Sequence, residues 1–440
     1  MKDIKIKDLI TVGFALFAMF FGAGNLLFPP FLGLGSGPQW LLAFICYIIA
    51  DAGLAIVVMI AVQVSGGKME NVVGRVGKVC ATIIGISVAL CIGPIIAIPR
   101  TGAVAFEMGA QPLGFNNKVI FCAIYFLVAF VLMLKGSKVV DIVGNFLTPF
   151  LLIGLIAMII IGIVNPIGDI SNVVQFDSVV KKGIGDGYQT LDALASLLFS
   201  ILIINSANDK GYTDPKLKMK FVCGASIVAG IGLFIVYGGL AYLGATTSSL
   251  SEITFSEIGN SELVVFITKK LLGQPGVVIL GIVVTLACMT TTIGLTASIS
   301  NYFSSLSKGK IKYEVFVIII CLFSFGGACL GVGAIINIAA PILNLVYPAV
   351  LVLVILTFFK NQIKSDLIVQ GATLFAFLTS LATEANAFLE EGSKIPYIMD
   401  LPLASLGLHW IIPAIVGGIL GFILSMVIKP KQAVNNNISK

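Results

Sequence analysis

The sequence predicts an all-α polytopic membrane protein with about 12 transmembrane helices, on three observations. Hydrophobic residues make up 58% of the 440 residues and charged residues only 11%, and the mean hydropathy is +1.07. Apolar runs long enough to cross a bilayer, which takes about 20 residues, recur along the whole chain. The loops between them are alternately rich and poor in Lys and Arg. No stretch resembles a separate soluble domain, so we predict one transmembrane domain over residues 1–440.

The apolar runs between polar breaks give the expected spans. Their approximate ranges are 9–34, 39–64, 79–106, 118–134, 139–164, 187–207, 219–245, 275–305, 313–332, 335–359, 366–388 and 408–428. The first run follows a basic N-terminus, as in a signal peptide, but it is too long and lacks an A-x-A-like cleavage site. We therefore keep it as the first span. In the loop 246–274, the amphipathic stretch SELVVFITKKLLG is too short to cross a bilayer, and we expect a re-entrant or surface helix there.

The basic residues predict the orientation. Of the 27 Lys and Arg residues, 20 fall in the set of loops that includes both termini, six fall in the opposite set, and Arg100 lies inside a span. Because Lys and Arg are enriched in cytoplasmic loops, we expect both termini in the cytoplasm. The net charge of +6 is thus an orientation signal, and we expect the lipid bilayer and no nucleic acid as a partner.

The first span, which contains GFALFAMFFGAGNLLFPP, is expected to break. Gly22 and Gly24 each lower helix propensity by about 1 kcal/mol, and Pro29 and Pro30 each remove a backbone donor. A break inside the bilayer leaves backbone groups that need partners, and such breaks are typical of transporter binding sites. A plain Pro/Gly kink is the alternative. Asn25 favours a binding break, because its carboxamide can offer an oxygen to a cation.

The sixth span carries polar residues on one helical face. Asp192 is followed by Ser196 and Ser200 at i+4 and i+8. This span comes five spans after the first, where an inverted five-plus-five repeat places the partner of a broken helix. We therefore expect helices 1–5 (about 9–164) and 6–10 (about 187–359) to be inverted repeats, with helices 11–12 (about 366–428) accessory. No Gly or Pro interrupts this span, so an expected unwinding near Ala195–Phe199 rests on position alone.

The eighth span contains LACMTTTIGLTASIS, with four hydroxyl residues within two turns: Thr290, Thr291, Thr292 and Thr296. Hydroxyls in membrane helices usually hold helices together or bond to carbonyls of their own helix. Three consecutive threonines cannot all face one partner, so at least one faces a different surface. Hydroxyl and main-chain carbonyl oxygens together suit a hard cation such as Na⁺.

Charged side chains inside membrane spans are functional candidates by default. The candidates are Asp51, Arg100, Glu107, Asp141, Asp192 and Glu384. Arg100 and Glu107 are seven residues apart on one helical face, which indicates a structural or gating role at the outer mouth. We expect Asp51 to neutralise a lysine or line the cytoplasmic path, and Glu384 to be structural. The eight cysteines form no CxxC pair, so no disulfide framework or metal site is expected, and His409 is expected at the membrane interface.

The stretch GFALFAMFFGAGNLLFPP, followed by Trp40, and the span DALASLLFSILIINS resemble the bacterial branched-chain amino acid:cation symporter family (BrnQ-type carriers). The resemblance covers essentially the whole chain. It implies uptake of leucine, isoleucine and valine, driven by Na⁺ or H⁺, across the bacterial inner (cell) membrane. It also implies the leucine-transporter fold of the amino acid–polyamine–cation superfamily, with broken helices 1 and 6.

The resemblance also implies site residues. The substrate-binding residues would be Gly22, Ala23, Gly24, Asn25, Asp192, Ser196 and Phe199. Free amides at the first break would hold the substrate carboxylate, as helix N-termini do. The sodium ligands would be Ala18, Phe21, Ala287, Thr290 and Thr291. The superfamily pattern Ser-Leu-Gly-Phe reads Ser-Leu-Leu-Phe here, with Leu198 in place of the glycine.

Other functions have less support from the sequence. No span shows a catalytic histidine cluster, a nucleophile elbow or a metal-ligand set, so we expect no enzyme. A filter-like loop or charged rings, which indicate a channel, do not occur either. A proton-coupled transporter of another small amino acid or a nucleobase stays open, with Asp192 as the proton carrier. The number of subunits stays open as well.

Overall fold

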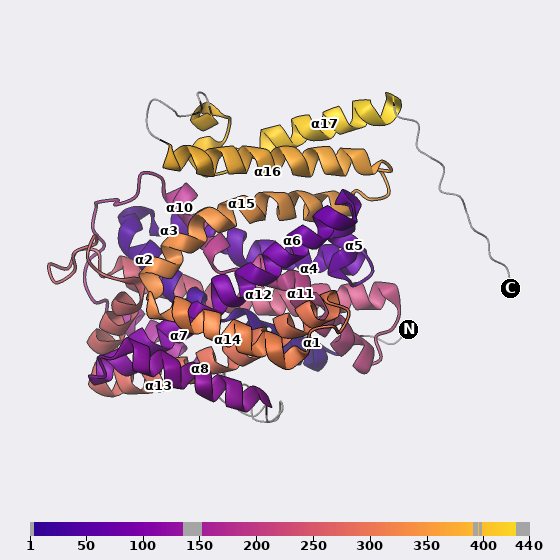
Figure 1. The fold of residues 1–440 in the computed structure, drawn as a ribbon. Helices are drawn as coiled ribbons and strands as arrows, with labels where there is room; N and C mark the ends of the chain where they lie inside the picture. The colour runs from indigo at the N-terminus through magenta and orange to yellow at the C-terminus, as the bar shows by residue number, and fades with distance from the viewer. Residues whose placement is uncertain (1–3, 135–151, 390–394, 396–397, 428–440) are drawn as a thin grey trace.

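The computed structural model describes residues 4–134, 152–389, 395 and 398–427, and all regular structure within them is helical (Figure 1). Seven continuous helical stretches are long and apolar enough to cross a membrane, and four shorter apolar helices accompany them. In Figure 1 most long helices run across the view. Helices α16 and α17 lie together in a layer above α15, and they correspond to predicted spans 11 and 12.

The first half of the chain forms predicted spans 1 to 5. The helices are α1 (Ile6–Phe20), α2 (Ala23–Ser36), η1 (Gly37–Gln39), α3 (Trp40–Ile48), η2 (Ile49–Gly53), α4 (Leu54–Val64), α5 (Met69–Val73), η3 (Gly74–Val76), α6 (Lys78–Leu90), η4 (Cys91–Ile95), α7 (Ala97–Val104), η5 (Ala105–Ala110), η6 (Gln111–Leu113) and α8 (Lys118–Leu134). Of the fifth span, only the helix Leu152–Val164 is described. The predicted functional candidate Asp141 lies outside the described residues.

The second half forms predicted spans 6 to 12. The helices are α10 (Val179–Gln189), α11 (Asp192–Asp209), α12 (Pro215–Ala245), α13 (Asn260–Leu306), α14 (Tyr313–Cys329), α15 (Val332–Phe358), α16 (Asp366–Phe388), η8 (Ile398–Asp400), η9 (Ala404–Leu406) and α17 (Ile411–Val427). The stretch SELVVFITKKLLG is helical as expected. It continues into the eighth span through a kink at Gly273, whose φ is 66°, so the two form one bent helix.

The first span breaks at Phe21 and Gly22, between α1 and α2, as predicted. Pro29 and Pro30 were expected to interrupt the span further, and this is wrong, because α2 continues through both to Ser36. Close packing against α12 supports this part of α2. A Cβ on Gly244 would collide with the carbonyl oxygen of Pro30, so the two backbones are in direct contact.

This contact predicts that Gly244→Val lowers the stability of the fold. A branched side chain would force α2 and α12 apart, and overpacking typically costs about 1–3 kcal/mol. The measurement is thermal unfolding of the purified protein in detergent. Gly326→Val is the matched control, because a Cβ on Gly326 meets nothing within 4 Å. Equal unfolding temperatures for the two variants would contradict the contact.

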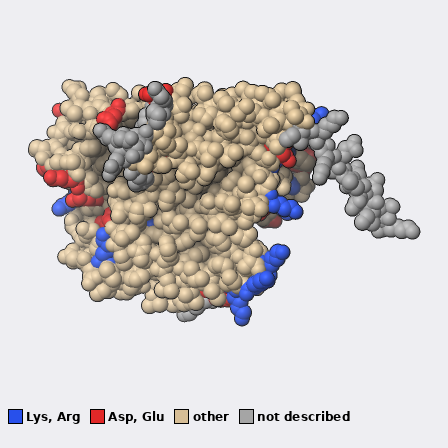
Figure 2. Space-filling model, turned by 45° about the horizontal axis from the view of Figure 1, so that its top comes forward, with Lys and Arg blue, Asp and Glu red and all other residues tan. Residues whose placement is uncertain are grey.

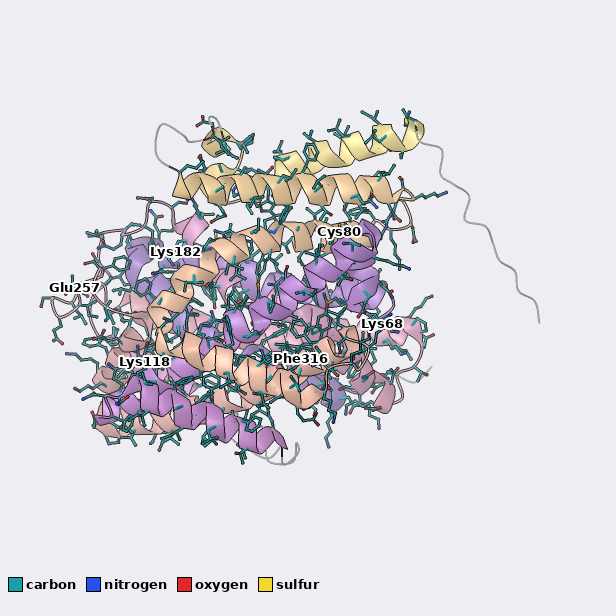
Figure 3. The ribbon with its side chains drawn as sticks, in the orientation of Figure 1. Lys68, Cys80, Lys118, Lys182, Glu257 and Phe316 are labelled. Carbon is teal, nitrogen blue, oxygen red and sulfur yellow. The ribbon has the colours of Figure 1, made fainter. Side chains whose placement is uncertain are left out.

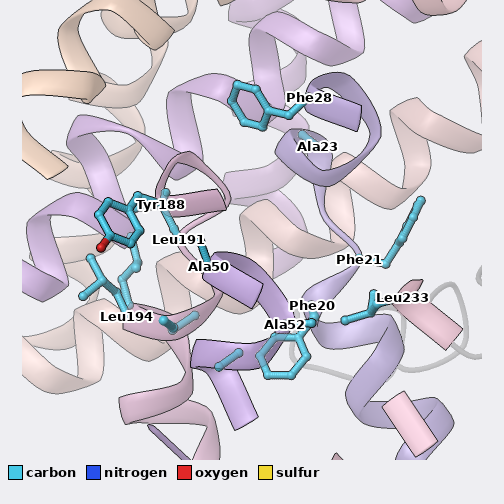
Figure 4. Close-up of a cluster of buried hydrophobic side chains, with 14 of the residues drawn as sticks. Phe20, Phe21, Ala23, Phe28, Ala50, Ala52, Tyr188, Leu191, Leu194 and Leu233 are labelled. Atoms are coloured by element: carbon cyan, nitrogen blue, oxygen red, sulfur yellow. The ribbon is translucent and has the colours of Figure 1, made fainter. Parts of the chain in front are cut away.

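The sixth span also breaks, but not near Ala195–Phe199, so that expectation is wrong. The break lies at Leu191, which has the left-handed φ of 71° between α10 and α11. Figure 4 shows Leu191 in the turn that joins the two helices, near Ala50. Helix α11 is continuous from Asp192 to Asp209, and within it Ser196 Oγ donates to the Asp192 carbonyl at 2.8 Å.

The third span breaks too, which the sequence analysis did not predict. Gly93 has non-helical angles (φ −106°, ψ −128°) inside η4 and is followed by Pro94. Helix α7 starts only at Ala97. The Gly-Pro pair is a known interruption signal that was available in the sequence.

Loops of the basic set meet at one end of the helix bundle. Lys210 Nζ lies 3.0 Å from Asp8 Oδ1, and Tyr212 OH donates to Asp8 Oδ2 at 2.7 Å, so the loop after α11 is tied to the start of α1. Arg75 Nε lies 2.7 Å from Asp366 Oδ1 and ties the loop after α5 to α16. We call this end, defined by these five residues, the basic end.

Figures 2 and 3 show how basic side chains are distributed between the two ends of the bundle, on the face and at the residues that they display. Lys and Arg side chains gather at the right-hand end in Figure 2. Figure 3 places Lys68 toward this end and Lys118, Lys182 and Glu257 toward the other. Lys68, Arg75 and Lys210 of the set with both termini therefore lie toward the basic end, and Lys118 and Lys182 of the opposite set lie toward the other. Of that set, Lys2, Lys135, Lys138, Lys429, Lys431 and Lys440 lie outside the described residues, as does Lys394 of the opposite set.

Candidate functional site

A cavity of about 470 Å³, one of two of similar size among the described residues, lies where the breaks of the first and sixth spans meet, and we call it the large cavity. Its walls come from α1, α2, η4, α7, α11 and α13 and from the turn between α10 and α11. Figure 4 shows Phe20 at the end of α1 and Ala23 at the start of α2, with non-helical chain between them. Two helices, α2 and α11, therefore begin at this cavity, and a helix N-terminus presents free N–H groups and a partial positive charge.

Asn25 and Asp192 join the two breaks. Asn25 Nδ2 donates to Asp192 Oδ2 at 2.8 Å, and both side chains are buried. The bond uses one oxygen of Asp192 and leaves the amide oxygen of Asn25 as an acceptor, which is the chemistry that an ammonium group requires.

Six of the seven predicted substrate residues line the cavity. They are Gly22, Ala23, Gly24, Asn25, Asp192 and Phe199. Ser196 does not line it, since it is fully buried and its hydroxyl bonds to its own helix. Residues that were not predicted also line it, and they include Thr190, Thr101 and Arg100.

Much of the remaining wall is apolar. It is formed by Ala15, Ala18, Met19, Phe20, Ile92, Ala97, Leu191, Ala195, Leu202 and Leu295. A few polar groups at the breaks and apolar side chains elsewhere are the usual composition of a small-molecule site. The arrangement suits a small ligand with a charged head and an aliphatic body.

A buried polar contact lies behind the second break. Thr190 Oγ1 donates to Asp51 Oδ1 at 2.8 Å, and Asp51 lies in the π-helical turn η2 of the second span. Asp51 is fully buried, so its predicted role of neutralising a lysine or lining the cytoplasmic path is wrong. The contact ties η2 to the turn at Leu191, and π-turns are frequent at functional sites.

The five predicted sodium ligands surround two adjoining cavities. Ala18, Thr290 and Thr291 line the large cavity. Phe21, Ala287 and Thr291 line a small one of about 10 Å³ between the first break and α13. Gly22, Ala23 and Thr291 belong to both walls, so the two spaces adjoin.

The donor set is chemically suited to a hard cation. Thr290 Oγ1 and Thr291 Oγ1 donate to the Ala287 carbonyl at 2.8 and 3.1 Å, which leaves the hydroxyl lone pairs free to coordinate but occupies the Ala287 carbonyl with two donors. Helix α1 ends at Phe20. Within the described residues, the Ala18 carbonyl therefore accepts no hydrogen bond from a helical N–H one turn later. Hydroxyl and carbonyl oxygens are the ligands that hard cations prefer.

The third threonine of the run faces elsewhere, as predicted. Thr292 Oγ1 lies 2.5 Å from Thr101 Oγ1 and 2.9 Å from Tyr125 OH. These contacts join α13 to α7 and α8. Thr292 is thus a packing residue, whereas its two neighbours in sequence line the cavities.

The large cavity reaches the surface toward the basic end. Its wall includes Ala15, Leu202 and Ser298, which are exposed, and α1 begins and α11 ends at that side. Toward the opposite end, rings cover the outer half of α2. The Phe255 ring lies 5.2 Å from Phe31 and 5.4 Å from Phe176, measured between centroids.

Arg100 and Glu107 do not act together. Glu107 Oε1 accepts from the Val332 N–H at 3.0 Å and lies 4.0 Å from Lys118 Nζ, so it supports the start of α15. Arg100 points to the large cavity instead. Arg100 lies in α7, whereas Glu107 lies within the π-helical turn η5 (Ala105–Ala110), which shifts the register. The expected shared face and joint gate are therefore wrong.

The other singled-out polar residues lie apart from the large cavity. Glu384 accepts from Asn344 Nδ2 at 3.0 Å, which joins α16 to α15 and fits its expected structural role. A second cavity of about 140 Å³ is lined by residues that include Glu384 and His409. None of its wall residues belongs to the large cavity.

Comparison with known proteins shows the family. Residues 5–428 match the family described as Branched-chain amino acid transport protein. The chain belongs to this family. The branched-chain amino acid permease BraB of Bacillus subtilis (strain 168) is 35% identical over 98% of this chain and 99% of BraB. BrnQ of Salmonella typhimurium, also named a branched-chain amino acid permease, is 32% identical over 96% of each chain.

Solved structures confirm the fold of this branched-chain amino acid transport protein. Mhp1, a nucleobase-cation-symport-1 family transporter, superimposes with a TM-score of 0.63 at 15% identity, over 95% of this chain and 93% of Mhp1. MhsT in complex with L-phenylalanine gives 0.55 at 15% identity, over 95% and 98%. These neighbours have the leucine-transporter fold. The predicted fold class and family are therefore confirmed, and the protein is a multi-pass membrane transporter.

Proposed function

We propose that this transporter is a symporter that imports leucine, isoleucine and valine, driven by a Na⁺ gradient, by alternating access. The observation that carries the proposal is the cavity at the two helix breaks. Free amides of α2 and the Asn25–Asp192 pair face a largely apolar space there. The amides suit a carboxylate, the pair suits an ammonium group, and the apolar wall suits an aliphatic side chain.

The open side of the cavity indicates which conformational state this structure represents. With the basic end in the cytoplasm, as the positive-inside rule requires, this structure is the inward-open state. The aromatic contacts of Phe255 with Phe31 and Phe176 then close the outer side. Outward opening would separate these rings, with the breaks at Gly22 and Leu191 as hinges.

We predict that unlabelled isoleucine and valine compete strongly with labelled leucine for uptake. A methylene group in an apolar pocket discriminates by only about 1–3 kcal/mol, so the three should differ modestly. Lysine and glutamate should compete weakly, because the apolar part of the wall that would contact the substrate side chain has no charge to pair with theirs. The measurement is leucine uptake by cells that express the protein in a strain without other leucine carriers. Strong competition by lysine or glutamate would contradict the substrate class.

Sodium is the proposed coupling ion because all five proposed ligands are neutral. No protonatable group is needed among Ala18, Phe21, Ala287, Thr290 and Thr291, and the first three would use carbonyl oxygens. A cation held there would join α1 to α13. Because binding couplings are reciprocal, Na⁺ and substrate should raise each other's affinity by the same factor.

Thr291→Val tests the ion site, because it keeps the side-chain shape and removes one oxygen. We expect the Na⁺ concentration for half-maximal uptake to rise about 3- to 10-fold, as the loss of one polar contact of about 0.5–1.5 kcal/mol predicts. Thr379→Val is the control, since it makes the same substitution outside both cavities and removes a hydroxyl that donates to the Phe375 carbonyl of its own helix at 2.8 Å. An unchanged Na⁺ dependence in Thr291→Val would remove this residue from the site.

A proton-coupled transporter of another small amino acid or a nucleobase is the second candidate. The observation that favours it is the presence of two buried acids, Asp192 and Asp51, beside Thr190, whose hydroxyl donates to Asp51 Oδ1 and accepts from the Asp192 backbone N–H. Mhp1 belongs to a nucleobase-cation-symport family. Uptake that is independent of Na⁺ and is lost in Asp192→Asn would transfer the coupling role to a proton on that carboxyl group.

A further inference from the structure

Arg100 is a buried cation that forms no direct ion pair with any described residue. Its side chain is 3% exposed, and among the described residues no Asp or Glu oxygen lies within 4.0 Å of its guanidinium. A buried charge is costly unless it is paired and hydrogen-bonded. The sequence analysis predicted a structural or gating role for Arg100 and Glu107 at the outer mouth. Neither role explains why the charge of Arg100 is buried, because the two residues do not act together.

Among the described residues the guanidinium has one hydrogen-bond acceptor, and it lies at the wall of the cavity. Arg100 Nη1 donates to the Gln189 carbonyl at 2.6 Å, and Arg100 lines the cavity. Its Nε is buried and has no partner. The Cζ atom lies 5.6 Å from the centre of the Phe28 ring, which packs the group without satisfying its donors.

The guanidinium of Arg100 lies against the start of α2. A Cβ on Gly24 would be 2.6 Å from Arg100 Nη2 and 2.8 Å from Cζ, so only glycine allows this approach. Two sources of positive potential, the guanidinium and the free amides of α2, therefore face the same part of the cavity. Like potentials at short range are unfavourable without an anion between them.

We propose that Arg100 binds the carboxylate of the transported amino acid, together with the amides at the start of α2. The inference rests on the proposed function and adds a residue to its site. Arg provides a rigid fork of donors that matches a carboxylate. The neighbouring acid Asp192, which interacts electrostatically with Arg100, is the complementary group for the substrate ammonium. The site thus recognises both ends of a zwitterion, and Arg100 makes it specific for α-carboxylates.

The test compares ligands with and without the carboxylate. Leucinol has the side chain and amine of leucine but a hydroxyl in place of the carboxylate. Equilibrium binding of leucine and of leucinol is measured on the purified full-length protein, in Na⁺, for the wild type and Arg100→Gln. The wild type should prefer leucine by about 10- to 100-fold, as a charge-assisted contact predicts. In Arg100→Gln the preference should fall to a few-fold, mainly through weaker leucine binding.

The ratio of leucine affinity to leucinol affinity distinguishes recognition of the carboxylate by Arg100 from a purely structural role of this residue. If Arg100 only supported the fold, Arg100→Gln would weaken both ligands equally and keep the preference, which would overturn the proposal. Arg75→Gln, at the basic end, is the matched control and should leave both affinities unchanged. If Arg100→Gln does not fold, Arg100→Lys keeps the charge without the fork, and it should reduce the preference for leucine without abolishing it. An unchanged preference in Arg100→Lys would then overturn the proposal.

Failure of the proposed function gives a different result. If the protein does not take branched-chain amino acids, the wild type itself will not bind leucine. If the wild type binds leucine but Arg100→Gln keeps the full preference over leucinol, the substrate proposal stands and the role of Arg100 fails.

Discussion

Gly24→Leu is expected to abolish leucine binding and uptake while the protein still folds. The new Cβ would lie 2.6 Å from Arg100 Nη2, and the rest of the side chain would extend into the cavity beside Asn25. The substitution would therefore displace the guanidinium and fill the space for the substrate head. The loss of leucine binding should be complete within the sensitivity of the assay, because the substitution affects both the volume of the cavity and the polar groups that would bind the substrate.

The control for this variant is Gly333→Leu, where a Cβ meets nothing within 4 Å. Thermal unfolding in detergent shows whether each variant is folded, and leucine binding shows whether its site is intact. Unchanged leucine affinity in a folded Gly24→Leu protein would show that the substrate does not bind at the first break.

Asn25→Leu should reduce leucine uptake by about 10- to 100-fold. The variant keeps a similar volume but removes the donor at 2.8 Å from Asp192 Oδ2. A buried carboxyl group without its donor is costly, by about 1–3 kcal/mol or more if it is charged. The change also removes the direct bond between α2 and α11, the two helices that begin at the cavity.

Asn344→Leu is the matched control for Asn25→Leu. Asn344 makes the same kind of bond, to Glu384 at 3.0 Å, but between α15 and α16 and outside the large cavity. It should alter stability more than uptake. If Asn25→Leu transports leucine at the wild-type rate, the bond between the two breaks has no role in transport.

Features encoded locally were predictable from the sequence. The spans follow from apolar length, and the first break follows from Gly22, Gly24 and the polar Asn25 in an apolar run. The cation candidates Thr290 and Thr291 could be found because adjacent hydroxyls are unusual in such a run. Each of these signals lies within a few neighbouring residues.

Features that depend on tertiary contacts were not predictable in this way. Leu191 adopts a left-handed φ of 71°, which a leucine rarely does on local preference, and the neighbouring bond between Thr190 and Asp51 connects two distant spans. The position of Arg100 depends on the break at Gly93 and on the π-turn η5, which change the helical face that a regular helix would give. A projection of the sequence onto a regular helix therefore placed Arg100 on the same face as Glu107.

The most direct test of the central claim is leucine uptake into proteoliposomes that contain only this protein, with an imposed ion gradient. An inward Na⁺ gradient at equal pH should drive accumulation of leucine above its external concentration. An inward H⁺ gradient without Na⁺ should not. The opposite result, accumulation driven by H⁺ and unaffected by Na⁺, would contradict sodium-coupled symport.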